Sequence, residues 1–448
     1  MMIRKILIAN RGEIARRIIR TCKARGIKTV AVYSEADQSM PFVREADERM
    51  LIGPPPVTQS YLQLEKIIKI AKQTGAQAIH PGYGLLSENP IFAGRCEEEG
   101  ILFLGPKPEV IRSMGDKIEA RNRMRQANIP VVPGVNTNIE TVEQACEIAS
   151  QIGYPVMLKA SAGGGGIGMQ LCFGKEEVIK AFGSTKSRAK AYFGNDAVFI
   201  EKYIEEPRHI EVQIAGDQYG KIVHLFEREC SIQRRHQKVL EESPSPFLTP
   251  QTKEAMYHAA IRAAETIHYT GVGTVEFIVG SDQSFYFLEM NTRLQVEHPV
   301  TELITGYDLV GLQIDIAEGK ALPEQEQITA KGHALEMRIY AEDPKTFLPS
   351  PGKIMAYQMP DGDGIRIDDG VETGSEVTPF YDPMIAKVIL SGSTRAETIG
   401  HALAALQEMK VEGIKTNITL LKRVLQHEKF QQGQYDTTFI PNHLSERG

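Results

Sequence analysis

Short apolar runs alternate with helix-like periods through the first third of the chain. Four runs have the length and composition of buried strands, namely residues 5–9, 29–33, 77–81 and 101–105. After the first run, Ile14, Ile18, Ile19 and Cys22 recur at helical spacing, and Gly26 suits the position just past a helix end. Strands that alternate with helices indicate a parallel, doubly wound sheet covered by helices. The predicted fold class is therefore α/β.

The turn after the first strand bears on what this sheet could bind. Residues 10–13 read Asn-Arg-Gly-Glu and contain a single glycine. A dinucleotide-binding turn has the spacing G-x-G-x-x-G, because its glycines let the backbone approach a pyrophosphate. The sequence therefore disfavours an NAD site at this turn.

Composition and charge narrow the class of protein. The chain has 448 residues and a formal net charge of -6, so about three domains are expected and nucleic-acid binding is disfavoured. Its five cysteines lie far apart without a Cys-x-x-Cys pair, which favours reduced thiols. The longest apolar run near the start has four residues, too few for a signal peptide or a membrane span. We therefore expect a cytoplasmic protein that binds no membrane.

A glycine cluster lies in a second region, which begins near Pro130 and ends near Tyr203. Lys159 precedes it, and Gly163–Gly166 are four consecutive glycines followed by Ile167 and Gly168. Backbone amides without side chains around them can surround a phosphate, although a flexible surface loop would have the same composition. Because no G-K-[ST] follows, this is not a Walker A loop. The cluster predicts nucleotide binding on a different architecture.

Carboxylates on a predicted hairpin supply the second half of a nucleotide site. Runs 272–279 and 284–291 read as strands, and a turn centred on Ser281 and Asp282 would set Glu276 opposite Phe287, with Glu289 as its diagonal neighbour. Strand alternation puts Asn291 on the face of Glu289. Oxygen ligands in this arrangement could hold hard cations against a triphosphate. A solvated strand face is the alternative, which the apolar neighbours of Glu276 disfavour.

Two polar segments add candidates for anion binding. Arg293 and Glu297 flank an extended stretch just past Asn291, and residues 231–238 read Ser-Ile-Gln-Arg-Arg-His-Gln-Lys. Basic groups beside a nucleotide site could bind anionic oxygens of a substrate. They could also form an ordinary charged loop. Stacking aromatics, which a single-stranded nucleic-acid site would need, are not interleaved with them.

These segments together resemble the signatures of the biotin carboxylases, a family of ATP-grasp ligases. The similar stretches are the glycine cluster, HPGYGLLSEN (80–89), EKYIEEPRHIEVQ (201–213), RRHQKVLEESPSP (234–246), EMNTRLQVEHPVTE (289–302), GHALEMRIYAEDP (332–344) and FLPSPGKI (347–354). They occur in the family's order and spacing, from Ile6 to about Phe439. RRHQK, RLQVEHP and Arg338 in combination are highly specific, because other ATP-grasp enzymes share only the glycine loop and metal carboxylates.

The resemblance implies an N-terminal pre-ATP-grasp domain with a doubly wound parallel sheet, an ATP-grasp domain with a mobile glycine-rich lid, and a C-terminal α+β domain. We expect the boundaries 1–115, 116–330 (lid about 131–203) and 331–448. The residues that the resemblance assigns to ATP are Lys117, Lys159, Gly163, Gly164, Gly165, Gly166, Glu201, Lys202, Ile204, His209, Gln233 and His236.

The remaining assignments concern metal, bicarbonate and biotin. Two Mg²⁺ or Mn²⁺ ions would be held by Glu276, Glu289 and Asn291. The bicarbonate site would consist of Lys238, Arg293, Gln295, the backbone of Val296, and Glu297 as the base. Arg338 would stabilise the biotin enolate, with Tyr83 and Gly84 near the biotin ring. Lys238 and Arg293 should favour the charged form of Glu297.

Two positions depart from the family pattern. Ile167 stands where a basic residue is usual, which puts one contact of the lid to phosphate in doubt, and Glu229 replaces the usual Asp. Biotin would be supplied by a separate carrier protein, with carboxyltransferase subunits and a second copy of the chain as further partners. Acetyl-CoA carboxylase, which serves fatty acid synthesis, is the carboxylase to which we expect the chain to belong. Carboxylases of other acyl-CoA substrates, pyruvate or urea are the alternatives. The rival functions are a carbamoyl-phosphate-type ligase and a catalytically inactive scaffold subunit.

Overall fold

The N-terminal part of the computed structural model, which describes residues 2–135, 138–160 and 168–444, is built on a parallel sheet. Its five strands are β1 (Lys5–Ile8), β2 (Lys28–Ser34), β3 (Glu48–Gly53), β4 (Ala78–His80) and β5 (Leu102–Phe103). They lie in the order β3-β2-β1-β4-β5 and every pair is parallel. This confirms the predicted doubly wound sheet. The edge strand β3 was not predicted, because it buries only Ile52 fully.

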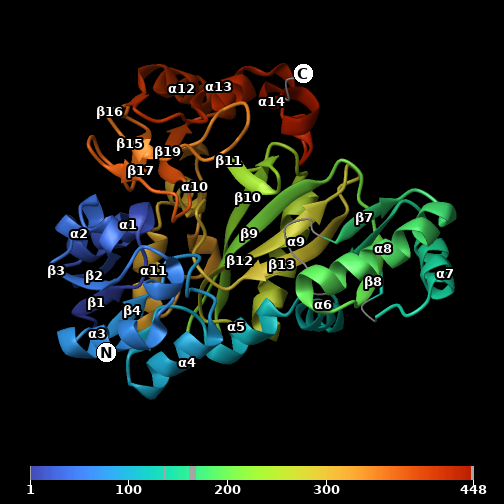
Figure 1. The fold of residues 1–448 in the computed structure, drawn as a ribbon, viewed down its shortest axis with the longest axis horizontal. Helices are drawn as coiled ribbons and strands as arrows, with labels where there is room; N and C mark the ends of the chain where they lie inside the picture. Colours follow the sequence, from blue (N-terminus) through green and yellow to red (C-terminus); the bar gives the residue numbers. More distant parts are fainter. Residues whose placement is uncertain (1, 136–137, 161–167, 445–448) are drawn as a thin grey trace.

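Helices cover both faces of this sheet, as the strand-helix alternation predicted. One face packs against α1 (Gly12–Ala24) and α11 (Leu309–Ala317), and the other against α3 (Leu64–Thr74) and α4 (Pro90–Glu98) (Figure 1). The short helices α2 (Pro41–Glu45) and α5 (Pro108–Gly115) complete this part. The carboxyl ends of the parallel strands, where ligands bind in such folds, lead into the loops at Asn10 and Tyr83.

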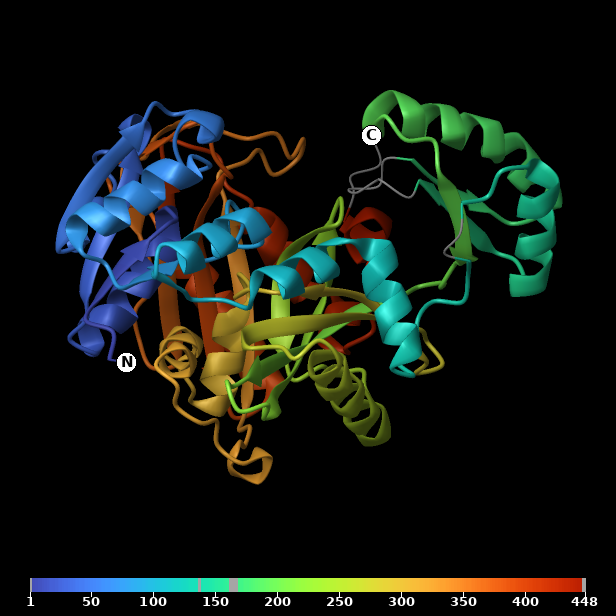
Figure 2. The ribbon, with the colours of Figure 1, turned by 90° about the horizontal axis from the view of Figure 1, so that it is seen from below.

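The predicted lid is a separate small unit with its own core. Its antiparallel sheet has the order β7-β6-β8, formed by β6 (Val156–Ala160), β7 (Met169–Cys172) and β8 (Val198–Lys202). It packs against α7 (Val142–Ile152) and α8 (Lys175–Phe193). Figure 2 shows it at one end of the molecule, joined to the rest by the segments on either side of it. The four glycines and Ile167 of the cluster lie outside the described residues.

A large antiparallel sheet runs through the remainder of the molecule in the order β13-β12-β9-β10-β11-β14-β19-β17. The strands are β9 (Arg208–Gly216), β10 (Ile222–Arg234), β11 (Gln237–Ser243), β12 (Gly271–Val279), β13 (Phe285–Asn291), β14 (His333–Tyr340), β17 (Ile365–Asp369) and β19 (Met384–Gly392). Because β11 pairs with β14, the predicted ATP-grasp and C-terminal regions contribute strands to one continuous sheet.

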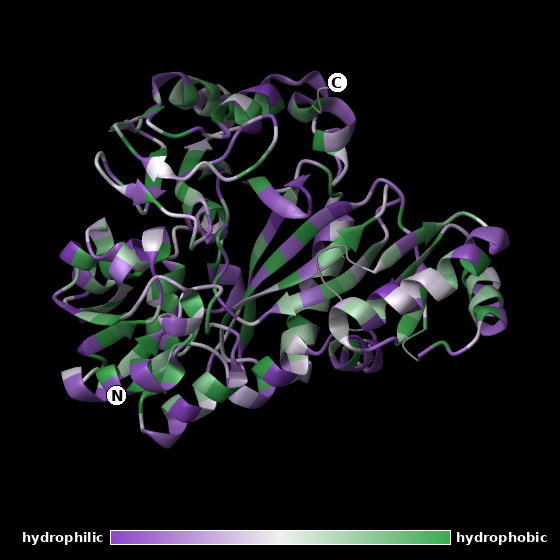
Figure 3. Cartoon of the chain, in the orientation of Figure 1, coloured by the Kyte–Doolittle hydropathy of each residue, from purple (hydrophilic) through white to green (hydrophobic). Residues whose placement is uncertain are grey.

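Alternation along these strands separates an apolar face from a polar one. In β9, Ile210, Val212 and Ile214 pack in a core with α9 (Pro250–Thr266) and α6 (Lys117–Gln126). Hydrophilic and hydrophobic residues alternate along the central strands in Figure 3. His209 and Glu211 therefore point to the opposite face. That face is where the predicted site residues collect.

The carboxylate hairpin differs in register from the sequence-based expectation. Glu276 lies directly opposite Glu289, not Phe287, and Phe287 is instead the partner of Phe277. The register shifts between Glu276 and Phe277, so the exposed Leu288 has no register partner. This extra residue is a β-bulge, which sequence alternation alone does not reveal. The bulge brings the two carboxylates closer than the predicted diagonal arrangement.

The C-terminal part completes the molecule. Helices α12 (Arg395–Glu408), α13 (Ile418–Gln426) and α14 (Glu428–Gln431) cover its core, and two small ribbons pair β15 (Gly352–Lys353) with β18 (Glu376–Val377) and β16 (Ala356–Gln358) with β20 (Lys410–Glu412). All five cysteines are buried and free. Among the described helices, none combines the length and the apolar character needed to cross a membrane.

Candidate active site

Strand register brings the polar candidates together on one face of the large sheet. Glu276 of β12 faces Glu211 of β9 on one side and Glu289 of β13 on the other. Lys238 stands at the start of β11, beside Gln233 of β10. Directly opposed residues in antiparallel strands have their Cβ atoms about 4.5–5.5 Å apart. Residues far apart in sequence therefore form one cluster.

Lys238 is the centre of this cluster. Its Nζ donates hydrogen bonds to Glu211 Oε2 at 2.6 Å, to Glu276 Oε1 at 2.9 Å and to Glu297 Oε1 at 2.6 Å. Burial alone would lower the pKa of Lys238, but these three carboxylates outweigh it and raise the pKa well above its usual value. Lys238 is therefore a permanent cation in the site.

Glu297 lies in the loop between β13 and α10 (His298–Thr305) and is 2% exposed. Its Oε1 accepts from Lys238, and its Oε2 accepts from Arg338 Nη2 at 2.9 Å. Burial would raise the pKa of this carboxyl, yet the positive charges of Lys238, Arg338 and Arg228 together hold it below its ordinary range. As expected from the sequence, Glu297 is ionised at neutral pH. Arg338 and Arg228 assist Lys238, and Arg293 is close enough for Glu297 to raise its pKa.

Arg338 belongs to β14, whose side chains are all buried. Its Nη2 also lies 2.6 Å from Glu241 Oε1. Burial raises the pKa of Glu241 to about 7 against the lowering effect of Arg338. Arg338 thus stands between two carboxylates, one of them readily protonated near neutral pH.

Arg293, Gln295 and Asn291 form a second layer around Glu276. Glu276 Oε1 accepts from Asn291 Nδ2 at 2.8 Å and from Gln295 Nε2 at 2.7 Å. Arg293 donates from Nη2 to Asn291 Oδ1 at 2.8 Å and from Nε to Glu88 Oε2 at 2.8 Å. The predicted bicarbonate and metal residues are therefore neighbours in a single network.

The oxygen donors of this network fit a divalent cation. Glu276 and Glu289 face each other across the hairpin, and Lys117 Nζ lies 3.9 Å from Glu289 Oε2. Burial and the charge of Glu276 raise the pKa of Glu289, so these opposed carboxylates repel. A hard cation bound by carboxylate and amide oxygens would relieve that repulsion. By contrast, Glu211 and Glu297 are each paired with an arginine as well as with Lys238, Glu211 with Arg228 and Glu297 with Arg338.

Residues assigned to ATP line the approach from the lid. Lys159 contacts Glu201, which also accepts from Arg121 Nη1 at 2.6 Å. The Lys202 ammonium is engaged, donating to Gly153 O at 3.0 Å and Tyr154 O at 2.9 Å. Ile204, two residues after Lys202, lies in the half-buried connection to β9. Lys159, Glu201 and Lys202 are therefore held by contacts where the lid joins the rest of the molecule.

His209 connects the nucleotide side to the carboxylates. Its Nε2 lies 2.7 Å from Glu276 Oε2, and its Nδ1 is 2.8 Å from Gln233 Nε2. Burial would lower the pKa of His209, but Glu276 raises it overall. His236 stands apart on the exposed tip of the β10–β11 hairpin, with φ +66 after Arg235 at φ +50. Two successive non-glycine residues with positive φ form a costly turn, which is typical of functional positions.

The loop after β4 brings Tyr83 and Gly84 to the edge of the cluster. Asn10 Nδ2 donates to Pro81 O at 2.7 Å and to Tyr83 O at 2.8 Å. A Cβ on Gly82 would lie 2.8 Å from that same nitrogen, so only glycine permits this contact. The Tyr83 hydroxyl donates to Glu13. The parallel sheet and the large sheet therefore both contribute to the site.

Several charged groups of the site were not anticipated. Five of them are buried, namely Glu13, Glu211, Arg228, Glu241 and Lys387, and the sixth, Glu88, is exposed. Polar residues at every second position of β9 (His209, Glu211 and Gln213) were a signal for one of them, since a strand with two buried faces should be continuously apolar. The isolated Lys387 in the apolar run of β19 was another.

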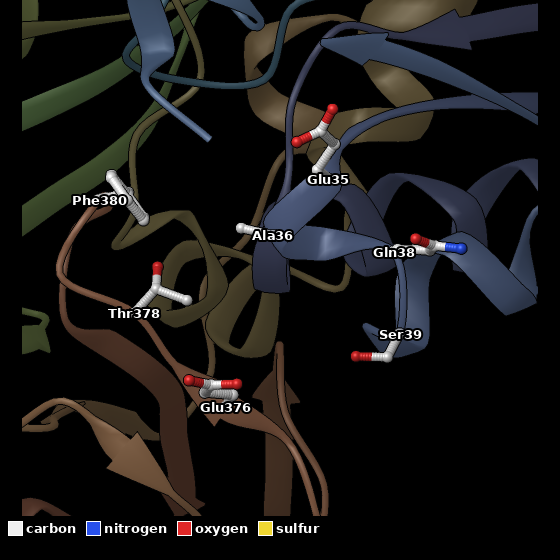
Figure 4. A pocket seen from close by; sticks show the side chains of 7 residues that line it. All are labelled: Glu35, Ala36, Gln38, Ser39, Glu376, Thr378 and Phe380. Carbon is white, nitrogen blue, oxygen red and sulfur yellow. The ribbon is translucent and has the colours of Figure 1, made fainter. Parts of the chain in front are cut away.

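A separate surface cleft of about 620 Å³ lies between the loop after β2 and the loop before β19. Figure 4 shows its lining, which includes Glu35, Gln38, Glu376 and Phe380. None of the predicted site residues that the structure describes lines it. The arrangement that can do chemistry is the charged cluster.

The fold and the cluster together define an ATP-dependent ligase with carboxylates placed for metal and a permanent lysine beside a buried, ionised glutamate. In agreement, residues 116–325 match the family model described as "Carbamoyl-phosphate synthase L chain, ATP binding domain". Residues 2–111 match "Biotin carboxylase, N-terminal domain" and residues 336–442 match "Biotin carboxylase C-terminal domain".

The chain belongs to the biotin carboxylase family and has biotin carboxylase activity. It is 58% identical over 444 residues to Biotin carboxylase 2 of Bacillus subtilis (strain 168), covering 99% of this chain and 100% of that protein. It is 52% identical to a pyruvate carboxylase subunit of Methanothermobacter thermautotrophicus, covering 98% and 90%. The solved biotin carboxylase domain dimer of Hydrogenobacter thermophilus 2-oxoglutarate carboxylase, in complex with MgADP, ADP and bicarbonate, shares 46% identity with a TM-score of 0.93, covering 99% and 98%.

Proposed function

We propose that the chain carboxylates biotin on a separate carrier protein, through carboxyphosphate formed from ATP and bicarbonate. The observation that carries this proposal is the position of Glu297, ionised and held between Lys238 and Arg338. Glu297 can then take part in activating bicarbonate, while Arg338 beside it acts on biotin, the carboxyl acceptor.

In the first step, an oxygen of bicarbonate attacks the γ-phosphorus of ATP and ADP leaves. Bicarbonate is a poor nucleophile, so its hydroxyl proton must be removed as it attacks. Glu297 accepts this proton, while Lys238 and Arg293 bind the anion together with Gln295 and the backbone of Val296. Excluding water protects the labile carboxyphosphate.

In the second step, carboxyphosphate breaks down to carbon dioxide and phosphate, and the phosphate removes the proton from the ureido nitrogen of biotin. Negative charge then develops on the ureido oxygen. Arg338 is permanently cationic and stabilises that oxyanion before the nitrogen attacks carbon dioxide. Tyr83 and Gly84 are placed near the biotin ring.

Mg²⁺ or Mn²⁺, held by Glu276, Glu289 and Asn291, would neutralise the triphosphate. We expect Glu289→Gln to raise the Mg²⁺ concentration for half-maximal ATP cleavage by at least about tenfold, because even changes outside a coordination sphere cost 10–100-fold in affinity. The measurement is an Mg²⁺ titration of ATP cleavage, with Glu265→Gln on the exposed face of α9 as the matched control. An unchanged Mg²⁺ requirement in Glu289→Gln would contradict the metal assignment.

The remaining nucleotide residues act together on ATP. Lys117 and Lys159 neutralise phosphate oxygens, the Gly163–Gly166 loop covers them, and Glu201, Lys202, Ile204, His209, Gln233 and His236 enclose the rest of the nucleotide. With these roles, the domains are 1–115, 116–330 and 331–448, although the large sheet continues across the last boundary.

The proposed acceptor and partners are supported by analogy with the relatives. We place the chain in acetyl-CoA carboxylase, in the cytoplasm, with a biotin carrier protein and carboxyltransferase subunits. Relatives named for biotin carboxylase and for pyruvate carboxylase are similarly close, so a pyruvate or other acyl-CoA system is the alternative. A homodimer is supported by the dimeric form of the solved 2-oxoglutarate carboxylase domain.

We also expect that the chain does not carry biotin itself. Family carriers present the acceptor lysine between two methionines on a hairpin, whereas the only Met-Lys here is Met409-Lys410, at the junction of α12 and β20 and followed by Val411. Carboxylation should be poor on free biotin and efficient on a carrier. Mass spectrometry of the purified chain should show no biotin adduct, and finding one would contradict carboxylation in trans.

The experiment that tests the proposed function is ATP cleavage with each substrate omitted in turn. Cleavage should require bicarbonate and should be stimulated by biotin. Stimulation by ammonia instead would favour a carbamoyl-phosphate-type ligase, and no cleavage under any condition would favour an inactive scaffold subunit.

A further inference from the structure

Lys387 is a fully buried lysine in the centre of β19. Its Nζ donates to the Val296 carbonyl oxygen at 2.8 Å and lies 3.3 Å from Glu13 Oε2. In the sheet, Lys387 is directly opposite Arg338. A lysine is rarely buried completely, because removing its charge from water is costly unless it is paired. Its partners here belong to two other parts of the site.

Glu13 links Lys387 to Tyr83, the residue that the proposed function assigns to the biotin ring. It lies in the first turn of α1, is 4% exposed, and accepts a hydrogen bond from the Tyr83 hydroxyl through Oε1. Its two oxygens thus face different partners, Tyr83 and Lys387. A continuous path of contacts leads from the backbone of Val296 through Lys387 and Glu13 to Tyr83.

The backbones around this path are packed too closely to adjust. Gly370, just past β17, approaches the start of α1 so closely that a Cβ there would lie 2.7 Å from the Glu13 nitrogen and 3.0 Å from the Gly12 carbonyl carbon. The C-terminal part therefore fixes the start of α1 backbone to backbone. This contact lies beside the Glu13–Lys387 pair.

We propose that Glu13 and Lys387 are positioning residues that set the distance between the biotin ring and the activated carboxyl group. This inference rests on the proposed function, which places biotin near Tyr83 and bicarbonate against the Val296 backbone. Lys387 holds the Val296 carbonyl, and Glu13 holds the Tyr83 ring in register with it. Reacting atoms must approach within about 3–3.5 Å, and a displacement of 1 Å can cost about 10²-fold in rate.

Three variants separate the parts of this path. Glu13→Gln keeps an oxygen for the Tyr83 hydroxyl but removes the charge that pairs with Lys387. Lys387→Met keeps a long apolar side chain and removes the contacts with Val296 O, Glu13 and Asp368. In the double variant neither charge of the Glu13–Lys387 pair is left without the other, so part of any lost stability should return, while the lost alignment should not.

The test measures carboxybiotin formed per ATP cleaved, beside biotin-free ATP cleavage in the presence of bicarbonate. In Glu13→Gln the carboxybiotin formed per ATP cleaved should fall by a factor at least about tenfold larger than the factor by which the rate of biotin-free ATP cleavage falls. The KM for free biotin should rise. Lys387→Met should in addition raise the KM for bicarbonate, because Val296 loses its anchor. The double variant should form no more carboxybiotin per ATP cleaved than Lys387→Met does, even if its melting temperature recovers.

Arg16→Gln is the matched control. Arg16 lies on the same helix and joins it to the same C-terminal segment through Asp369 O at 3.2 Å, but its ion-pair partners are Glu45 and Asp369 and not residues of the path. Its loss should lower the melting temperature without changing carboxybiotin per ATP. Parallel loss of both activities in Glu13→Gln, or an unchanged yield per ATP, would overturn the positioning role while leaving the proposed function intact. If the unsubstituted chain cleaved no ATP in the presence of bicarbonate, both the positioning role and the proposed function would be contradicted.

Discussion

Replacing Glu297 by glutamine should abolish bicarbonate-dependent ATP cleavage whether or not biotin is present. The amide cannot accept the bicarbonate proton, and the loss of a general base typically lowers the rate by about 10²–10⁴-fold. The fold should persist, because Lys238 keeps Glu211 and Glu276 as partners and Arg338 keeps Glu241. The measurement is kcat for ATP cleavage beside the melting temperature.

Glu302→Gln provides the matched control for this loss. Glu302 is also a buried glutamate, five residues further along, and it pairs with Arg17 at 2.6 Å and Arg366 at 2.7 Å, away from the cluster. Its removal should reduce stability but not the activity of the folded protein. Glu297→Asp should retain more activity than Glu297→Gln, since it keeps a carboxylate. Equal activity of the two Glu297 variants would contradict the role of this residue as the base.

Replacing Arg338 by glutamine should separate the two half-steps. Biotin-free ATP cleavage should largely survive, because Lys238 and Arg228 still keep Glu297 ionised. Carboxybiotin formation should fall by about 10²–10³-fold, the typical loss when a group that stabilises an oxyanion is removed. Both activities are measured on the same preparation, with the melting temperature alongside.

The control for Arg338 is Arg395→Gln. Arg395 likewise pairs with a buried glutamate, Glu242, at 2.6 Å, and Glu242 is the neighbour of Glu241 in β11. This variant should be less stable but should keep its ratio of carboxybiotin to ATP cleaved. If Arg338→Gln lost both activities together at an unchanged melting temperature, the arginine would belong to the nucleotide side of the site instead.

Local patterns were sufficient to predict the parallel N-terminal sheet, apart from β3, and the carboxylate hairpin. Each depends on runs of neighbouring residues, such as Ile14 to Cys22 in α1, whose spacing the chain displays directly. The register of the hairpin could not be predicted in the same way. The bulge at Leu288 interrupts the pairing of β13 with β12, and an inserted residue of this kind is not revealed by the alternation of the sequence.

Several residues predicted for the site lie together in the structure, but buried charged residues that support them were not predicted. Lys238, Glu297 and Arg338 are conspicuous within motifs, and the structure brings Glu297 within hydrogen-bonding distance of the other two. Glu13 and Lys387 lie 374 positions apart in the numbering and meet only because β19 joins the large sheet beneath α1. The ion-pair partner of a buried charged residue can be identified only in the folded structure.

The transfer of oxygen from bicarbonate to phosphate tests the central claim most directly. With ¹⁸O-labelled bicarbonate in unlabelled water, attack by bicarbonate on the γ-phosphorus leaves one of its oxygens on the phosphate that is released. We predict that each phosphate formed during biotin carboxylation carries one labelled oxygen. Unlabelled phosphate under the same conditions would mean that water attacks ATP, and would contradict the formation of carboxyphosphate at this site.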